Sequence, residues 1–197
     1  MKYSLKNHSL LSYIIKFIGV FCICYFGTIA VIGLSAPGGY YSAFIHNYFD
    51  YVTLLRKSLM HGSATLLSLL GYHAVISNVY LKIENGREVQ MGFDCLGYGV
   101  MSFWIAFIVA NKGTWLKKLK WIFGGLFLIW LINVARISML LLSINNHWAF
   151  PFFDHHTWFN IFAYLLIFIL IYFYDKSGKM KSTMTDTKTT AFKVTDK

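Results

Sequence analysis

Long stretches of apolar residues with almost no charge constrain this chain more than any other feature. A helix that crosses the hydrocarbon core of a bilayer needs about 20 consecutive, mostly apolar residues. The longest stretches of this kind are residues 10–34, 121–144 and 158–174, and residues 96–110 form a shorter one. Only 13% of the 197 residues are charged, whereas soluble domains carry about 25%. The sequence therefore predicts an all-α polytopic membrane protein.

The distribution of basic residues predicts which connections face the cytoplasm. Lysines dominate the N-terminus, residues 111–120 and the C-terminal tail, whereas residues 35–94 and 145–157 are close to neutral. Because loops rich in Lys and Arg stay on the cytoplasmic side, both termini are expected inside. That arrangement requires an even number of spans, and the apolar stretches provide about four transmembrane helices. The same loops account for the net charge of +10, so no nucleic-acid partner is expected.

Two further segments complete the predicted organisation. Residues 59–77 are apolar but diluted by Ser, Gly, Thr and His, which favours an external amphipathic helical region lying at the membrane surface. Two short spans within residues 40–77 would also preserve the even count. Residues 175–197 are rich in Lys and Thr and hold few apolar side chains, so we expect a disordered cytoplasmic tail. Residues 1–174 are expected to form a single transmembrane domain.

Residues 79–93 carry the pattern of a small β-hairpin. Apolar and polar residues alternate from Val79 to Ile83, and they alternate again after Asn85-Gly86. Asn-Gly between two alternating stretches favours a tight hairpin turn. In lipid, the edges of a two-stranded hairpin would leave backbone groups without hydrogen bonds. The hairpin is therefore expected in water, outside the membrane, and it leads directly to Cys95.

Three polar residue types stand at the outer ends of the predicted spans. Cys95 opens one span, and Arg136 is the one charge within the next. Inserting an arginine into a membrane costs at least about 2.5 kcal/mol, and such residues are usually functional. His155 and His156 precede the last span. With the predicted topology, a thiol, a guanidinium and an imidazole from three helices reach the same leaflet.

These side chains have the chemistry of nucleophilic acyl transfer. The dipole at the start of a helix favours a negative charge, and the thiolate is the form of a cysteine that attacks a carbonyl carbon. An imidazole can move the proton. An arginine, which does not deprotonate, can stabilise the oxyanion. Gly97 and Gly99 would let a substrate backbone approach Cys95 closely.

The two adjacent histidines are not equivalent on a helix. Neighbouring positions point about 100° apart, so one of the pair is expected to face Cys95 and Arg136. His156 shares a helical face with Asn160, which favours it over His155. A metal site is the weaker alternative, because its ligands would lack the i, i+4 spacing of a helical site; those ligands would be Asp154, His155, His156 and His147. No cofactor is expected.

Three short motifs resemble those of a known family. The segment DCLG at 94–97, NVAR at 133–136 and the late histidine of HHTWFN are similar to the Cys, Arg and His motifs of the exosortase/archaeosortase family. The resemblance covers about residues 79–174. It implies that Cys95 is the nucleophile, that Arg136 stabilises the oxyanion or thiolate, and that His156 is the acid–base residue. His155 stays open, because Asn160 stands where the family tends to have a small residue.

The resemblance also implies a reaction and a place. Family members are proposed to be membrane cysteine transpeptidases that act on secreted, membrane-anchored proteins with a C-terminal sorting signal, which consists of a short motif, a transmembrane helix and a basic cluster. The active site would face outward from the bacterial cytoplasmic membrane. Cys95 would hold the substrate as a thioester, which an amine would release; release by water would make the protein a protease. Because most of the family's early spans are lacking, a partner subunit stays open.

Two other functions compete with this interpretation. In a non-catalytic membrane component of a surface-polysaccharide or secretion assembly, Cys95 would be passive and Arg136 would form a structural ion pair with Asp94 or Asp154. A small transporter has less support, because the sequence has no internal repeat.

Overall fold

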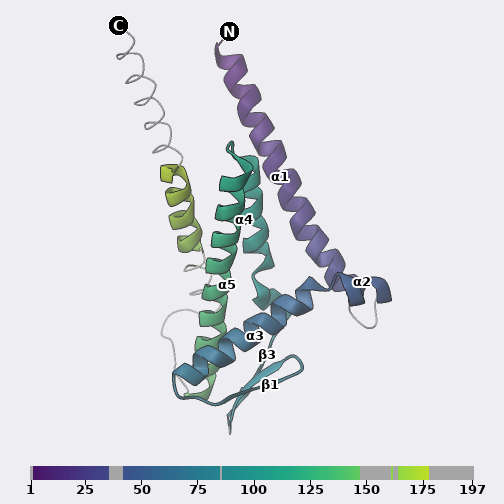
Figure 1. Ribbon diagram of the computed structural model, residues 1–197, viewed down its shortest axis with the longest axis vertical. Coiled ribbons are helices and arrows are strands. Elements are labelled where there is room, and N and C mark those ends of the chain that lie inside the picture. The colour runs from purple at the N-terminus through teal and green to yellow at the C-terminus, as the bar shows by residue number, and fades with distance from the viewer. Residues whose placement is uncertain (1, 36–41, 85, 147–160, 162–163, 178–197) are drawn as a thin grey trace. The chain divides into compact units, whose positions relative to one another are not determined.

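The computed structural model describes residues 2–35, 42–84, 86–146, 161 and 164–177. The chain divides into two units, residues 1–155 and 156–197, which are described separately. The first unit contains, in chain order, α1 (Lys2–Ser35), α2 (Ala43–Tyr48), α3 (Tyr51–Leu69), β1 (Ala74–Ser77), β2 (Tyr80–Ile83), β3 (Glu88–Gln90), the 3-10 turn η1 (Phe93–Leu96), α4 (Tyr98–Ala110) and α5 (Trp115–Asn145) (Figure 1).

In the second unit, residues 164–177 are helical. This helix includes residues 175–177 of the tail that was expected to be disordered. The remainder of that tail lies outside the described residues.

Two of the described helices are long and apolar enough to cross a membrane. They are residues Leu10–Ser35 of α1 and the whole of α5. α4 is also apolar but has 13 residues, which gives about 20 Å at 1.5 Å per residue against about 30 Å of hydrocarbon. Mostly helical structure with membrane-type helices agrees with the prediction, whereas the described residues do not confirm the count of four transmembrane helices.

α1 packs antiparallel against α4 through aromatic side chains. The rings of Phe17 and Phe103 meet edge to face with centroids 5.4 Å apart. Eight positions further along α1, the ring of Tyr25 lies 5.5 Å from that of Tyr98 at the start of α4. Because the later residue of α1 contacts the earlier residue of α4, the two helices run in opposite directions.

A buried indole joins α4 to α5. The Trp104 side chain of α4 is fully buried, and its Nε1 donates a hydrogen bond to the carbonyl of Trp121, 3.0 Å away. Gly125 lies one turn further along α5, where a Cβ atom would collide with the same indole nitrogen. The absence of a side chain at Gly125 therefore makes room for Trp104, and the bond satisfies the polar end of the indole.

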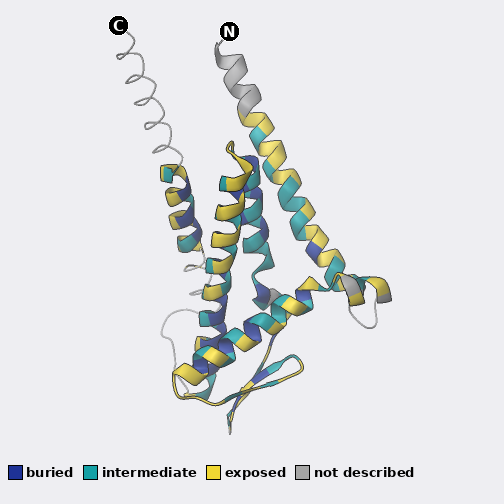
Figure 2. Cartoon of the chain, viewed as in Figure 1, coloured by how far each residue is buried: buried dark blue, intermediate teal, exposed yellow. Residues whose placement is uncertain are grey.

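The outer side of α5 is apolar and exposed. Large apolar side chains recur there every three or four residues, so they form one face of the helix (Figure 2); they are Leu116, Leu119, Phe123, Phe127 and Leu131. An exposed stripe of this kind is stable where the solvent is lipid. It supports the membrane assignment independently of helix length.

The helical region expected at residues 59–77 is shifted. α3 begins at Tyr51 and ends at Leu69, and β1 occupies the end of the predicted segment. The helix ends there because Gly71 adopts a positive φ of 85° and the N–H groups of Gly71 and Tyr72 bond back to the carbonyls of Ser68 and Leu67. This is the Schellman motif. α3 is not among the helices that could span a membrane, in line with an external position.

α3 lies across α5 at a contact made of small residues (Figure 1). A Cβ atom on Gly62 would stand 2.8 Å from Val134 Cγ2 and 2.9 Å from the Trp130 ring. Ser63 Oγ donates to the Val134 carbonyl at 3.3 Å, and Trp130 Nε1 donates to Ser58 Oγ at 3.0 Å. The two helices therefore approach closely and satisfy each other's polar groups.

The predicted hairpin forms, as part of a larger sheet. β2 pairs antiparallel with β3, with Leu81 opposite Val89, and β1 adds a third strand in the order β1-β2-β3. Leu81 and Ile83 are buried while Lys82 between them is exposed, as the alternating sequence pattern predicts. The third strand is a correction, since Ala74–Ser77 was expected to be helical.

A side-chain amide fixes the turn between β2 and β3. Residues 84–87 form this connection, which is longer than the two-residue turn that Asn-Gly favours. The Gly86 N–H donates to the Ile83 carbonyl at 2.8 Å. Asn145, at the end of α5, accepts from the Arg87 N–H at 2.6 Å and donates to the Arg87 carbonyl at 3.3 Å. The hairpin is thereby attached to the end of α5.

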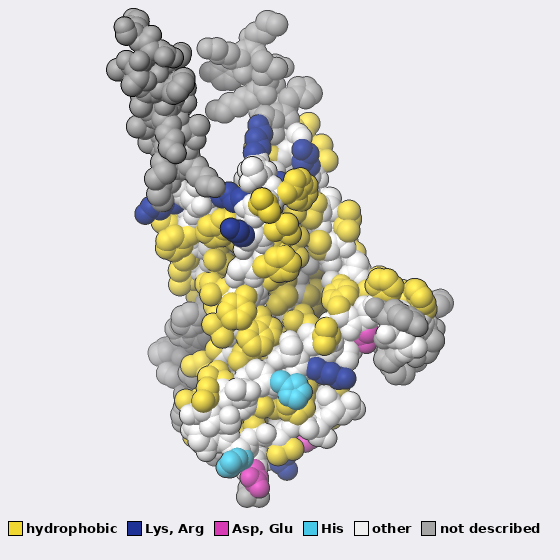
Figure 3. All heavy atoms as spheres, in the orientation of Figure 1, with side chains coloured by type: hydrophobic (Ala, Val, Ile, Leu, Met, Phe, Trp, Pro, Cys, Tyr) yellow, Lys and Arg dark blue, Asp and Glu magenta, His cyan; other side chains and the backbone are white. Residues whose placement is uncertain are grey.

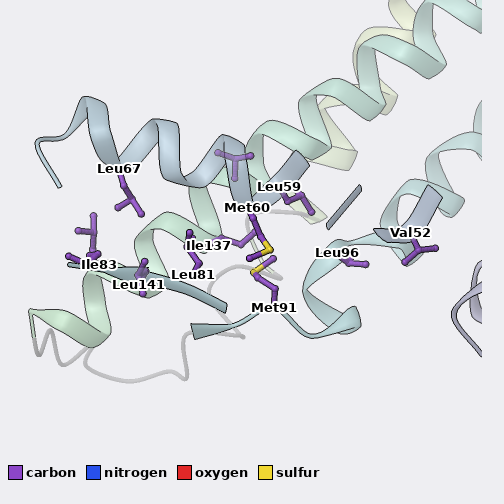
Figure 4. Packing of buried hydrophobic residues seen from close by; sticks show 12 residues of the cluster. Val52, Leu59, Met60, Leu67, Leu81, Ile83, Met91, Leu96, Ile137 and Leu141 are labelled. Atoms are coloured by element: carbon purple, nitrogen blue, oxygen red, sulfur yellow. The ribbon is translucent and has the colours of Figure 1, made fainter. Parts of the chain in front are cut away.

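The hydrophobic core lies between α3, the sheet and α5 (Figure 4). Met60 of α3 and Met91, just after β3, point toward each other in its centre. Its buried members are Val52, Leu59, Met60, Leu67, Leu81, Ile83, Met91, Leu96, Val134, Ile137, Leu141 and Leu142. Through Leu96 this core reaches the turn η1, directly beside Cys95.

The acidic residues of the first unit are unevenly distributed among its described segments. The lysines of residues 112–120 surround the connection between α4 and α5. Asp50 precedes α3, and Glu84 and Glu88 flank the turn between β2 and β3; the same segments carry Arg56, Lys57, Lys82 and Arg87. Figure 3 shows Lys or Arg side chains in both the upper and the lower part of the view, and Asp or Glu side chains in the lower part. Residues 112–120 thus carry lysines and no acidic residue, whereas residues 50–88 carry charges of both signs.

Candidate functional site

Cys95 lies in a short turn of its own and not at the start of a membrane helix. The turn η1 covers Phe93–Leu96, and the Cys95 N–H donates to the Gly92 carbonyl at 3.2 Å. Gly97 follows with φ 70° and ψ 20°, and α4 begins at Tyr98. The expectation that Cys95 opens the span is therefore wrong by three residues. The left-handed Gly97 ends one helix type and starts the other.

The Cys95 thiol stands at the border of the core. Its side chain is half-buried and packs against the buried cluster. The next residue, Leu96, is fully buried within that cluster, which anchors the turn. A half-buried thiol beside an anchored turn is both held in place and accessible to a reagent or substrate.

Asn133 of α5 joins this turn to the long helix. Asn133 is 7% exposed, and its Nδ2 donates to the Leu96 carbonyl at 3.2 Å. The same amide lies against Gly97, where any Cβ atom would collide with it. The Leu96 carbonyl therefore accepts its hydrogen bond from the buried Asn133 side chain. That side chain has room only because residue 97 is a glycine.

Arg136 follows Asn133 by three residues and is half-buried. Residues three apart on a helix are neighbours on one side, and their separation along the axis is about 4.5 Å. α5 and η1 are in contact, and Asn133 defines the level of that contact. Arg136 is therefore about one helical turn along α5 from the contact between Asn133 and Leu96.

A second arginine reaches the same turn from α3. The guanidinium carbon of Arg56 lies 4.7 Å from the centre of the Phe93 ring, within the range of a cation–π interaction. Arg56 Nη2 also donates to Thr53 Oγ1 at 3.4 Å. Sequence reasoning missed Arg56, because it lies 37 positions before Phe93 and has no motif of its own. It braces η1 from the side of α3.

The two glycines after Cys95 have neighbours within the chain. Gly97 faces Asn133, and the nearest atoms to a Cβ on Gly99 belong to the Tyr25 ring of α1, 3.6 Å away. The expectation that both would admit a substrate backbone is therefore corrected. The absence of a side chain at Gly97 lets Asn133 of α5 approach the start of α4, whereas a Cβ on Gly99 would make ordinary contact with Tyr25 of α1.

The predicted histidines fall outside the described residues. The structure does not describe His155 and His156, nor His147 and Asp154, the other ligands of the alternative metal site. The side chain of Asp94 is also outside the described part. Within the part of the chain that the structure describes, no group of three or more His, Cys, Asp or Glu side chains could hold a metal ion. The described site consists of Cys95, Asn133, Arg136 and Arg56.

Comparison with known proteins identifies the family. The family model for transmembrane exosortase (Exosortase_EpsH) matches residues 7–173. The chain belongs to the transmembrane exosortase family. Neither the search of curated proteins nor the search of solved structures found a match. Membership supports a membrane transpeptidase as the general activity, and the match to the exosortase model covers both membrane-length helices, the sheet, η1 and α4.

Replacing Gly97 by alanine should damage the exosortase site far more than replacing Gly99. A positive φ costs an alanine about 1–2 kcal/mol, and displacing Asn133 adds the cost of overpacking, about 1–3 kcal/mol. We expect Gly97→Ala to lower the melting temperature in detergent and to change the rate at which iodoacetamide alkylates Cys95. Gly99→Ala is the matched control, with ordinary van der Waals contact at Tyr25. Equal effects of the two substitutions would contradict the role given to Gly97.

Proposed function

We propose that this exosortase is a cysteine transpeptidase that cleaves the C-terminal sorting signal of secreted proteins, with Cys95 as nucleophile. The observation that carries the proposal is the hydrogen bond from Asn133 to the Leu96 carbonyl. It joins the residue next to Cys95 to the turn of α5 that bears Arg136. A thiol in η1 and a permanent cation on the α5 segment that contacts η1, in a family of membrane transpeptidases, have the chemistry of acyl transfer.

The proposed reaction begins with attack of the Cys95 thiolate on the carbonyl carbon of the scissile peptide bond. A C–S bond forms, and the negative charge moves to the carbonyl oxygen, where the Arg136 guanidinium stabilises it. Collapse of this intermediate breaks the C–N bond. His156, or His155, gives the leaving amine its proton. The N-terminal part of the substrate stays on Cys95 as a thioester.

A second nucleophile then releases the product. An amine from a glycan, lipid or peptide attacks the thioester carbonyl and gives a proton to the same histidine; the C–S bond breaks and the thiolate leaves, which completes transpeptidation. If water attacks instead, the same site acts as a protease. Both outcomes regenerate Cys95, and both pass through the same acyl-enzyme.

The proposed site faces outward from the bacterial cytoplasmic membrane. The lysines between α4 and α5 favour a cytoplasmic position for that connection, and the sheet, with its polar edges, favours water on the opposite side. Cys95 lies between the sheet and α4. Both termini are proposed to be cytoplasmic, which needs the even number of spans that the sequence predicts.

Mass spectrometry should detect an acyl adduct on Cys95. The exosortase would be co-expressed with a secreted protein that ends in a short motif, an apolar span and a basic cluster. We expect a hydroxylamine-labile adduct whose mass identifies the cleaved bond. Cys95→Ser should abolish both the adduct and cleavage, whereas Cys24→Ser, within α1, should leave both intact.

Cleavage that continues in the Cys95→Ser protein would end the transpeptidase proposal. It would leave the non-catalytic assembly role as the better explanation. The alternative role predicts that the serine protein supports assembly as well as the unmodified protein does.

Neutralising Arg136 should slow acylation. One oxyanion donor contributes about 10²–10³ in rate, so Arg136→Gln is expected to lower the rate of adduct formation about 100-fold or more. Arg136→Lys keeps the charge but loses the planar fork of donors, and its rate should be intermediate. Arg87→Gln, an exposed arginine near the sheet turn, is the control. A loss of thermal stability in Arg136→Gln that accounts for the lost activity would indicate a structural role.

Replacing each histidine alone should identify the acid–base residue. We expect His156→Ala to reduce cleavage about 10²–10⁴-fold, the usual contribution of general acid–base catalysis, and His155→Ala to change it a few-fold at most. His73→Ala, just before β1, serves as the control. The assignment is wrong if His155→Ala has the larger effect, and the acid–base role itself is wrong if both proteins cleave normally.

A further inference from the structure

We propose that the open edge of β3 binds an extended segment of the substrate by strand pairing and leads it to Cys95. The inference rests on the proposed function for the identity of the occupant, which is the peptide segment around the scissile bond of the anchored protein. β3 is one edge of the three-stranded sheet, since the order is β1-β2-β3. It also immediately precedes the turn that carries Cys95.

The pairing of β3 with β2 determines which of its backbone groups face outward. The Met91 N–H donates to the Val79 carbonyl at 2.8 Å, and hydrogen-bonded pairs alternate along an antiparallel ladder. Leu81 and Val89 therefore form a hydrogen-bonded pair. The pairs Tyr80–Gln90 and Lys82–Glu88 are non-hydrogen-bonded pairs. The backbone N–H and C=O groups of Glu88 and Gln90 therefore point away from β2.

These outward groups have room for another backbone. Among the described residues, neither the N–H nor the C=O of Glu88 is hydrogen-bonded, nor is the N–H of Gln90. The Gln90 carbonyl accepts from the Gly92 N–H at 3.1 Å. Both side chains are exposed. Two donors and an acceptor along one strand edge are complementary to an extended peptide, which is how strand addition binds its ligands.

The position of this edge relative to Cys95 selects the occupant. From Gln90 to Cys95 the chain has five steps, so the two residues lie within about 17 Å of each other, the reach of five extended residues. A peptide paired with β3 would therefore have a bond near Cys95 within about five residues of its paired segment. The free edge of β1 is two strands further away, about 9.6 Å at 4.8 Å per strand. That distance makes β3 the edge that can deliver a substrate to the thiol.

A proline at position 90 tests the pairing directly. Gln90→Pro removes the outward N–H and keeps the ladder to β2, because that N–H has no part in it; prolines are tolerated at such edge positions. Gln90→Ala loses the same side chain but keeps the N–H, so the ratio of the two variants isolates the backbone group. Ala74→Pro removes an outward N–H from β1, the opposite edge of the sheet, because Ala74 and Ile83 form a non-hydrogen-bonded pair.

The measurement is the binding of substrate by a protein that lacks the Cys95 thiol. Each variant would be made in the full-length Cys95→Ala protein, co-expressed with the anchored secreted protein described above and purified in detergent. The amount of co-purified substrate reports binding. Relative to Gln90→Ala, we expect Gln90→Pro to reduce capture about threefold to tenfold, the effect of one peptide hydrogen bond. Ala74→Pro should capture as much as the unmodified edge does.

The outcomes separate docking from chemistry. Equal capture by Gln90→Pro and Gln90→Ala overturns the docking proposal, as does absence of capture by the Cys95→Ala protein itself. A lower melting temperature of Gln90→Pro than of Gln90→Ala also overturns it, because the edge would then be paired within the chain. Continued cleavage with Cys95→Ala, together with lost capture in Gln90→Pro, would refute the thioester and support the docking edge. Glu88→Pro removes the other outward N–H of β3 and repeats the capture test. Glu88 is the first residue of the strand, where a proline disturbs the pairing least.

Discussion

The hydrogen bond from Asn133 to the Leu96 carbonyl connects the two parts of this protein that matter for chemistry. One part is a short turn with a half-buried thiol, and the other is a long helix with an arginine. The bond forms only because position 97 has no side chain and adopts a positive φ. A buried carbonyl left without a donor would cost about 1–3 kcal/mol. The fold therefore depends at this point on an amide and a glycine as much as on apolar packing.

The layer formed by α3 and the three-stranded sheet is stabilised by bonds of the same kind. Side chains form these hydrogen bonds in place of backbone partners. The Asn145 amide bonds the backbone N–H and C=O of Arg87. The side chains of Ser63 and Trp130 form hydrogen bonds between α3 and α5. Each joins an irregular or crossing segment to α5. Since α5 also supplies Arg136, the helix that stabilises α3 and the sheet and the helix of the candidate site are the same. Stability and chemistry are therefore coupled through one element.

Much of this arrangement could be predicted from local sequence. Apolar stretches predicted the long helices, and alternation predicted β2 and β3. β1 was not predicted, because its four residues follow a helical pattern and become a strand through pairing with β2. The Arg56–Phe93 contact and the role of Gly97 were also missed. Both depend on residues about 40 positions apart, which local patterns do not relate.

The rise of α5 sets the depth of the thiol. From Trp115, at the basic connection, to Asn133, the helix rises about 27 Å, and the hydrocarbon core is about 30 Å thick. In the proposed orientation, with Trp115 at the cytoplasmic boundary, a turn hydrogen-bonded to Asn133 stands near the boundary where acyl chains give way to headgroups, and not in open water. The membrane helix of the proposed substrate would end at that same boundary. The number of residues between that helix and the scissile bond would then determine whether the bond can reach the thiol. A bond close to the end of the helix meets the thiol without displacement of the helix, and a distant bond does not.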